Sequence, residues 1–211
     1  MRKGIFLIAI IGCALGMQAQ YTGYKPVASF DDFKTKFAAA SQKTTAIKSD
    51  FEQEKNLSML SEKIVSHGKF WFKKENMVRM EYTKPFQYLM VINNNKVYVK
   101  DGQKENSVST TSNKLFKQIN NIMVDCVKGT ALNNPDFKVR VFEGSANFLV
   151  ELTPVPKNLK ELFKNINIIV DKKEYGANKI ELHEQGGDNT IITFTNKELN
   201  ATIPDALFAV K

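Results

Sequence analysis

The sequence predicts an α+β fold in which a strongly curved antiparallel sheet of about 10–11 strands forms an incomplete β-barrel. Many short segments alternate apolar and polar residues and are joined by tight turns, which is typical of antiparallel strands. Two segments repeat apolar residues at three- and four-residue steps, which predicts amphipathic helices. Several strands are apolar on both faces, so we expect the helices to pack on the concave side as a lid, next to an apolar cavity.

The first helix is expected directly after Ser29, a good N-cap residue with an acidic residue three positions later. Phe30, Phe33 and Phe37 then fall on one face, and the pattern ends near Ser41. The simplest role for these phenylalanines is core packing.

An antiparallel meander follows the first helix. Pro85 interrupts one strand pattern, and the asparagines at 93–95 tolerate the positive φ angles that a tight hairpin needs. A polar stretch at 53–62 separates the first strand from the second. The strands expected here are 47–52, 63–73, 77–82, 86–92 and 96–100, and those expected later in the chain are 137–142, 148–152, 166–170, 179–184 and 190–195.

The second helix has the clearest periodicity in the chain. It is expected after a cap at Ser112 or Asn113 and before Gly129, and its opposite face is rich in lysine and asparagine. An amphipathic helix of this kind must cover an apolar surface. Its apolar positions are Leu115, Phe116, Ile119, Ile122, Met123, Cys126 and Val127.

The N-terminus has the pattern of a cleaved export signal. Arg2 and Lys3 precede an apolar run at 5–15, and Ala19 supplies the small residue needed at the cleavage position. We therefore expect a signal peptide at 1–19 and one domain at 20–211. The alternative is a lipoprotein signal, because the residues ending at Cys13 resemble a lipobox, and lipidation there would leave the protein anchored to a membrane.

Net charge and cysteine content limit which partners and which disulfide bonds we expect for this chain. Loss of the signal lowers the formal net charge from +8 to +6, because it removes two basic residues and no acidic one. The lysines are scattered singly, without the basic groove that nucleic-acid binding requires, although their charge could favour anionic membrane surfaces. Cys126 would be the only cysteine of the mature chain, so no intramolecular disulfide is expected, and a buried structural role suits it.

Catalytic motifs are missing from the sequence. His67 and His183 stand alone in strand patterns, without metal-binding spacing, and no nucleophile elbow is present. Glu181 and Glu184 flank His183 but alternate between strand faces, so they form no acid/base pair. We therefore expect no enzyme activity, no cofactor and no metal site.

One pair of strands resembles the LolA family of periplasmic carriers of outer-membrane lipoproteins. The later Leu89-Met-Val91, Lys96-Val-Tyr98 and the closing stretch 194–208 also resemble that family, so the likeness spans nearly the whole mature chain in element order. The family's strand pair is matched in register by Gly68, Trp71, Phe72, Lys73, Asn76, Met77 and Pro85.

The resemblance implies a periplasmic, monomeric carrier of acylated lipoproteins between the inner and outer membranes. Such carriers receive cargo from an inner-membrane ABC-type release complex and pass it to an outer-membrane acceptor. The alternative is a sensory or regulatory module of the same fold, or a carrier of another lipid or glycolipid.

The family also suggests where acyl chains would bind. Lys74 stands where LolA proteins have an arginine that reaches into the barrel and holds the lid helices, so Lys74 either controls the lid or is a solvated lysine at a strand end. With Lys74 taken as inward, strand alternation and the second helix give the expected cavity residues. They are Phe70, Phe72, Val78, Met80, Tyr82, Tyr88, Met90, Ile92, Leu115, Phe116, Ile119 and Met123.

Overall fold

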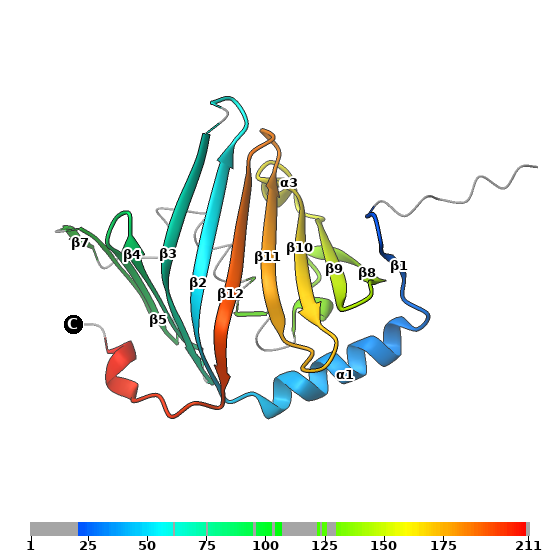
Figure 1. The fold of residues 1–211 in the computed structure, drawn as a ribbon, viewed down its shortest axis with the longest axis horizontal. Coiled ribbons are helices and arrows are strands. Elements are labelled where there is room, and N and C mark those ends of the chain that lie inside the picture. Colours follow the sequence, from blue (N-terminus) through cyan, green and yellow to red (C-terminus); the bar gives the residue numbers. More distant parts are fainter. Residues whose placement is uncertain are drawn as a thin grey trace, which may run out of the picture.

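A computed structural model describes residues 21–60, 62–74, 76–94, 96–102, 104–106, 122, 124–125 and 130–209. Twelve strands in this part of the chain form one antiparallel sheet (Figure 1). The sheet is strongly curved and its two edges, β1 and β7, do not pair, so it does not close into a barrel. The predicted fold class, an α+β fold with an incomplete barrel, is confirmed.

The strands form two meanders that meet where β12 pairs with β2. The order across the sheet is β1-β8-β9-β10-β11-β12-β2-β3-β4-β5-β6-β7. Their bounds are β1 Lys25–Pro26, β2 Ala46–Leu57, β3 Glu62–Lys73, β4 Met77–Lys84, β5 Tyr88–Asn93, β6 Lys96–Asp101, β7 Lys104–Asn106, β8 Phe137–Glu143, β9 Asn147–Pro154, β10 Phe163–Asp171, β11 Ala177–Glu184 and β12 Asn189–Leu199.

The strand β2 is longer than its sequence pattern indicates. Residues 53–57 were expected in a polar connection, but they continue the ladder between β12 and β3. Ion pairs to nearby strands explain why polar residues are stable there: Lys55 pairs with Glu184 of β11, and Glu54 pairs with Lys63 of β3. The hydrophobic pattern alone could not show this.

The helix α1, Phe30–Lys43, begins where the sequence predicts. The Ser29 hydroxyl accepts a hydrogen bond of 3.2 Å from the Asp32 amide, and Phe33 and Phe37 are buried. Figure 1 shows α1 crossing the lower ends of the strands in the β9 to β12 half of the sheet. The remaining described helices are short: α3 Lys157–Lys160, η1 Ala131–Asn133 and η2 Asp205–Phe208.

The second predicted helix is described only in part. Ile122, Val124 and Asp125 are helical, and Ile122 is 2% exposed, as expected for its apolar face. Most of that segment, Cys126 included, lies outside the described residues, as does the predicted signal at 1–19 with Cys13. Among the helices that the structure describes, none has the length and hydropathy needed to cross a membrane.

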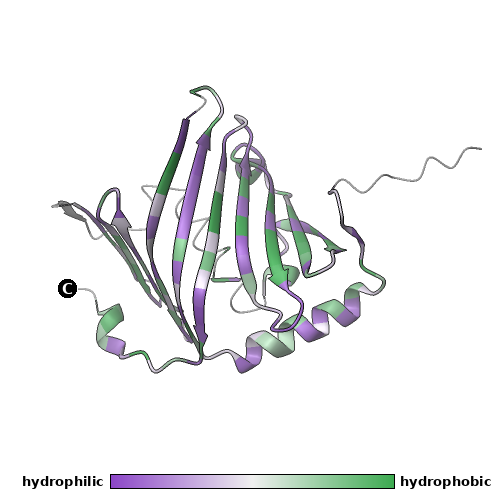
Figure 2. Cartoon of the chain, in the orientation of Figure 1, coloured by the Kyte–Doolittle hydropathy of each residue, from purple (hydrophilic) through white to green (hydrophobic). Residues whose placement is uncertain are grey.

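The core lies on the concave side of the sheet. Figure 2 shows apolar and polar bands alternating along the strands, as expected when one face is buried. A smaller cluster lies on the convex side of β3 to β5, where Ile203 and Phe208 of the C-terminal segment pack with Val91. The second apolar face of β5 is therefore covered by the C-terminal segment.

Candidate functional site on the concave face

Three rows of apolar side chains cross β3, β4 and β5 on the concave face. Gly68 pairs with Tyr82, and Tyr82 with Tyr88; Phe70 pairs with Met80, and Met80 with Met90; Phe72 pairs with Val78, and Val78 with Ile92. Because directly paired residues share one face, this register places all eight described residues of the predicted cavity on the same side. Seven are buried and Tyr88 packs against them.

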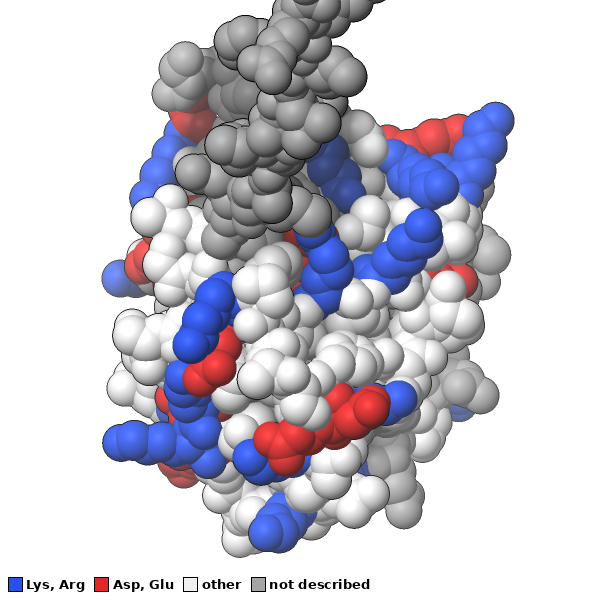
Figure 3. Space-filling view, turned by 90° about the vertical axis from the view of Figure 1, so that its right-hand side faces the viewer, with Lys and Arg blue, Asp and Glu red and all other residues white. Residues whose placement is uncertain are grey.

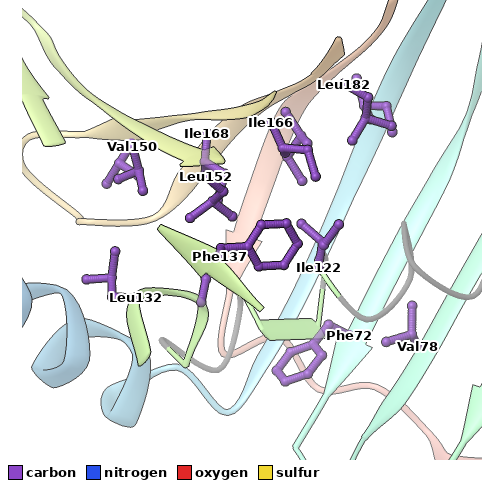
Figure 4. Close-up of a cluster of buried hydrophobic side chains, with 14 of the residues drawn as sticks. Phe72, Val78, Ile122, Leu132, Phe137, Val150, Leu152, Ile166, Ile168 and Leu182 are labelled. Carbon is purple, nitrogen blue, oxygen red and sulfur yellow. The ribbon is translucent and has the colours of Figure 1, made fainter. Parts of the chain in front are cut away.

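Four residues of the predicted cavity cannot be placed. Leu115, Phe116, Ile119 and Met123 lie outside the described residues. Their neighbour Ile122 belongs to the concave core cluster together with Phe72 and Val78 (Figure 4). The predicted contact of these four residues with β3 to β5 stays a prediction.

The other half of the sheet also contributes buried apolar side chains to this core. Figure 4 shows side chains from β8, β9, β10 and β11 converging on the same interior as Phe72. The alternation of apolar and polar residues predicts half-buried strands here. No residue indicates which face of them points inward, so the sequence alone does not assign their side chains to the site. The inward side chains of these strands include Phe137, Val150, Leu152, Ile166, Ile168 and Leu182.

Two tyrosines carry polar groups into this apolar face. Tyr82 donates a hydrogen bond of 2.8 Å to Gln53, and burial raises the pKa of its phenol well above the ordinary value. Burial, helped by the charge of Asp101, raises the pKa of Tyr88 to about 12. Both phenols therefore stay neutral at physiological pH.

A small pocket opens beside the C-terminal end of α1. Its walls come from α1, β2, β3, β11, β12 and the turn at 174–176, and it holds about 50 Å³. Phe70 is the only residue of the predicted cavity in its described lining. Ile47, Ile180 and Phe194 also line it, and no pattern in the sequence indicates that these three positions meet.

The exposed Lys74 contacts this end of α1. Its ammonium donates a hydrogen bond of 2.5 Å to the backbone oxygen of Gln42, in the last turn of the helix. A cation there interacts favourably with the negative end of the helix dipole. Whether this contact controls a lid stays a prediction.

The convex face carries a polar network centred on the buried Glu151. Arg140 donates to both of its oxygens at 2.8 Å, and Tyr21 donates at 2.5 Å. Burial, together with the Glu151 charge, raises the pKa of the Tyr21 phenol. These contacts satisfy Glu151, so the network is best explained as structural.

The two histidines lie apart from the apolar site. His183 lies 3.6 Å from Glu181 on the convex face, and His67 lies 3.6 Å from Glu52. Within the described residues, no group of three or more His, Cys, Asp or Glu side chains could hold a metal ion. Neither histidine faces the concave core.

Charges of both signs are mixed on the surface drawn in Figure 3. That view shows lysine and arginine side chains interleaved with acidic ones. Among the ion pairs of the described residues, Lys172 lies 2.7 Å from Glu143 and lowers the pKa of the Glu143 carboxyl.

Comparison with protein families gives one match. A family model described as outer membrane lipoprotein carrier protein LolA matches residues 42–211, which include all strands from β2 to β12. A search of curated proteins finds no match.

Solved structures give matches at low sequence identity. MucB is 14% identical with a TM-score of 0.51, covering 86% of this chain and 62% of its own. The MucA/MucB complex of Pseudomonas aeruginosa matches at 13% identity and a TM-score of 0.50, covering 85% of this chain and 60% of that chain. A LolA superfamily protein from Nitrosomonas europaea matches at 10% identity and a TM-score of 0.46, covering 87% and 99%. At this identity, the likeness to MucB shows a shared fold.

Proposed function

The chain belongs to the LolA family, and from this membership we propose that it is a periplasmic carrier of lipoproteins. Its concave sheet face would bind the acyl chains of a lipoprotein and carry them from the inner to the outer membrane. The predicted N-terminal signal would export the protein to the periplasm. Carriage of this kind needs no catalytic group.

The observation that carries the proposal is the apolar concave face built by both halves of the sheet. Each buried methylene contributes about 0.8 kcal/mol to membrane retention of an acyl chain, so a carrier must offer comparable burial. The rows through Phe70, Phe72 and Val78 provide such a surface. Met80 and Met90 lie at its centre, and their unbranched side chains adapt to mobile ligands.

Cargo binding requires the concave side to open. The pocket beside α1 holds about 50 Å³, which is room for a few water molecules rather than for several acyl chains. We place Lys74 as a restraint on this opening, because its bond to the Gln42 carbonyl ties α1 to the turn after β3. Breaking that bond would free the end of the helix.

The partners follow from the same proposal. A monomer would receive acylated lipoproteins from an inner-membrane ABC-type release complex and pass them to an outer-membrane acceptor. Nucleic acid is not among the proposed partners.

Native mass spectrometry of the protein purified from its own periplasm tests the proposal. We expect a fraction of the protein to carry a triacylated lipoprotein, which detergent should displace. Protein that remains empty in a cell with abundant lipoproteins would contradict the proposed carriage.

A second function is favoured by one comparison. MucB shares this fold, and a solved structure shows MucB in complex with MucA. A regulatory module that binds a protein partner is therefore the alternative. The same purification separates the two: a stoichiometric protein partner without lipid supports the regulatory module.

A further inference from the structure

A β-bulge in β12 directs a lysine into the pocket beside α1. Thr195 pairs with Asp50 and Glu198 pairs with Lys48, so Asn196 and Lys197 together face Ser49. Asn196 has a φ of 51°, and its side chain donates to Asp50 on the convex side. The extra residue reverses the alternation of the strand, a known way to redirect a side chain toward a site.

The reversal changes what β12 presents to the interior. Before the bulge, Ile192 and Phe194 face the concave core. After it, Lys197 and Leu199 line the pocket, where an unbroken strand would have placed them on the convex side. A charged side chain is thereby held against apolar walls that include Ile47.

The Lys197 ammonium is largely removed from water. Its side chain is 14% exposed, and the burial lowers its pKa. It donates a hydrogen bond of 3.3 Å to the Ala177 oxygen and lies 3.9 Å from the Glu174 carboxylate, whose side chain is 52% exposed. An ammonium has three donors, so this arrangement leaves capacity for a further acceptor in the pocket.

A second polar group lines the same pocket. Ser49 is 3% exposed, and its hydroxyl oxygen has no hydrogen-bond partner within the described part of the chain. Burial of a hydroxyl without a partner is costly, so such a group calls for an explanation. Ser49 lies between Phe70, its partner on β3, and the bulge that carries Lys197.

We infer that this pocket binds the carboxylate end of a fatty acid. Lys197 pairs with the carboxylate, Ser49 donates a hydrogen bond to it, and the first carbons of the chain pack against Ile47, Phe70 and Phe194. The inference rests on the proposed function, because the rest of the chain follows the acyl-binding concave face. A volume of about 50 Å³ suits the head of one such chain.

The donors favour a carboxylate over a phosphate. One ammonium and one hydroxyl match the two oxygens of a carboxylate, whereas a phosphate has more oxygens to satisfy. Glu174 would also repel a doubly charged group more strongly. On binding, the carboxylate takes the place of Glu174 beside Lys197.

Calorimetric titration of the intact mature chain with palmitate, and with hexadecanol as the neutral match, tests the inference. We expect palmitate to bind at least about 10-fold more tightly than hexadecanol, since hydrogen bonds to a charged group are among the stronger ones. Lys197→Met should lower palmitate affinity until the preference over hexadecanol is lost. Ser49→Ala should weaken palmitate binding about threefold or more, whereas Glu174→Gln should strengthen it.

Equal binding of palmitate and hexadecanol by the wild-type chain would overturn the inference, as would full palmitate affinity in Lys197→Met. Lys197→Arg, which keeps the charge, should retain the preference, and thermal melts establish that each variant is folded. A triacylated lipopeptide serves as a separate ligand. If it binds while palmitate does not, this inference fails and the carrier function stands; if neither binds, both fail.

Discussion

The ring of Phe51 lies over the backbone of Gly68, its direct cross-strand partner. A Cβ atom built on Gly68 would lie 2.5 Å from the Phe51 ring and 2.2 Å from the backbone oxygen of Glu81. The same ring makes an edge contact with Tyr82, at 4.9 Å between centroids. Glycine at 68, the first residue of the family-like strand pair, is therefore required by packing.

Gly68→Ala should lower the free energy of unfolding by about 1–3 kcal/mol, because the added methyl group overpacks the contact between β2 and β3. Chemical denaturation measures this change. Gly186→Ala is the matched control, since nothing lies within 4 Å of a Cβ built there. Equal stability of the two variants would show that Phe51 moves aside at no cost.

Met90→Glu should weaken binding of a triacylated lipopeptide by at least about 10-fold, because it places a charge in the middle of the apolar rows. Met90 is 2% exposed, so circular dichroism must establish that the variant is folded. Met80→Gln is a second, milder variant, at the neighbouring position in the same row. Ile169→Glu, on the convex face opposite Lys179, is the control. Full binding by both core variants would remove these rows from the site.

The sequence predicted one half of this site and missed the other for a definite reason. In β3 to β5, Lys74 stands where LolA proteins have an inward arginine and supplied an inward reference, and strand alternation then assigned Phe70, Phe72 and Val78 to one face. In β9 to β12 the same alternation was visible, but no residue fixed its direction. The bulge that turns Lys197 inward has no signature in the hydrophobic pattern, because its cause is the pairing register between β12 and β2.

The sequence shows apolar residues on both faces of several strands, and curvature of the sheet around the helices is the expected explanation. The structure places the C-terminal segment on the convex side of β3 to β5: Arg79 donates to the Leu207 oxygen at 3.1 Å, and Asn93 donates to the Phe208 oxygen at 3.1 Å. A contact between segments so distant in sequence cannot be derived from the local pattern of either one.

Phe208→Ala should destabilise the fold by about 3–5 kcal/mol, because this fully buried ring fills the convex cluster with Val91. Lipopeptide affinity of the folded fraction should not change, since the ring lies on the side away from the proposed site. Thermal unfolding and calorimetric binding measure the two effects. Phe30→Ala, at a ring 37% exposed, should cost much less. Loss of affinity without loss of stability would place Phe208 in ligand binding instead.

Arg140→Ala should cost about 1–3 kcal/mol, because it leaves the 2% exposed Glu151 without its charged partner. The Arg140 side chain is 47% exposed, so water can reach part of the pair and reduce the penalty. The double variant Arg140→Ala/Glu151→Gln should be more stable than Arg140→Ala alone, since the buried charge is gone. Denaturant titration of the three proteins tests this order. A double variant that is less stable would mean that Glu151 is held by its other contacts.

The buried phenol of Tyr88 should make the free energy of unfolding fall at high pH. Burial raises the pKa of its phenol from 10.0 to about 12, so the folded protein resists the deprotonation that the unfolded chain undergoes near 10. Below pH 10 both states are protonated and the group has no effect on pH dependence. As the pH rises from 10 toward 12 only the unfolded state loses the proton, so the free energy of unfolding falls. Tyr88→Phe removes this ionisation and should make the fall shallower in denaturant titrations across that range. An equally steep fall in the variant would assign the effect to other groups, among them the buried Tyr82.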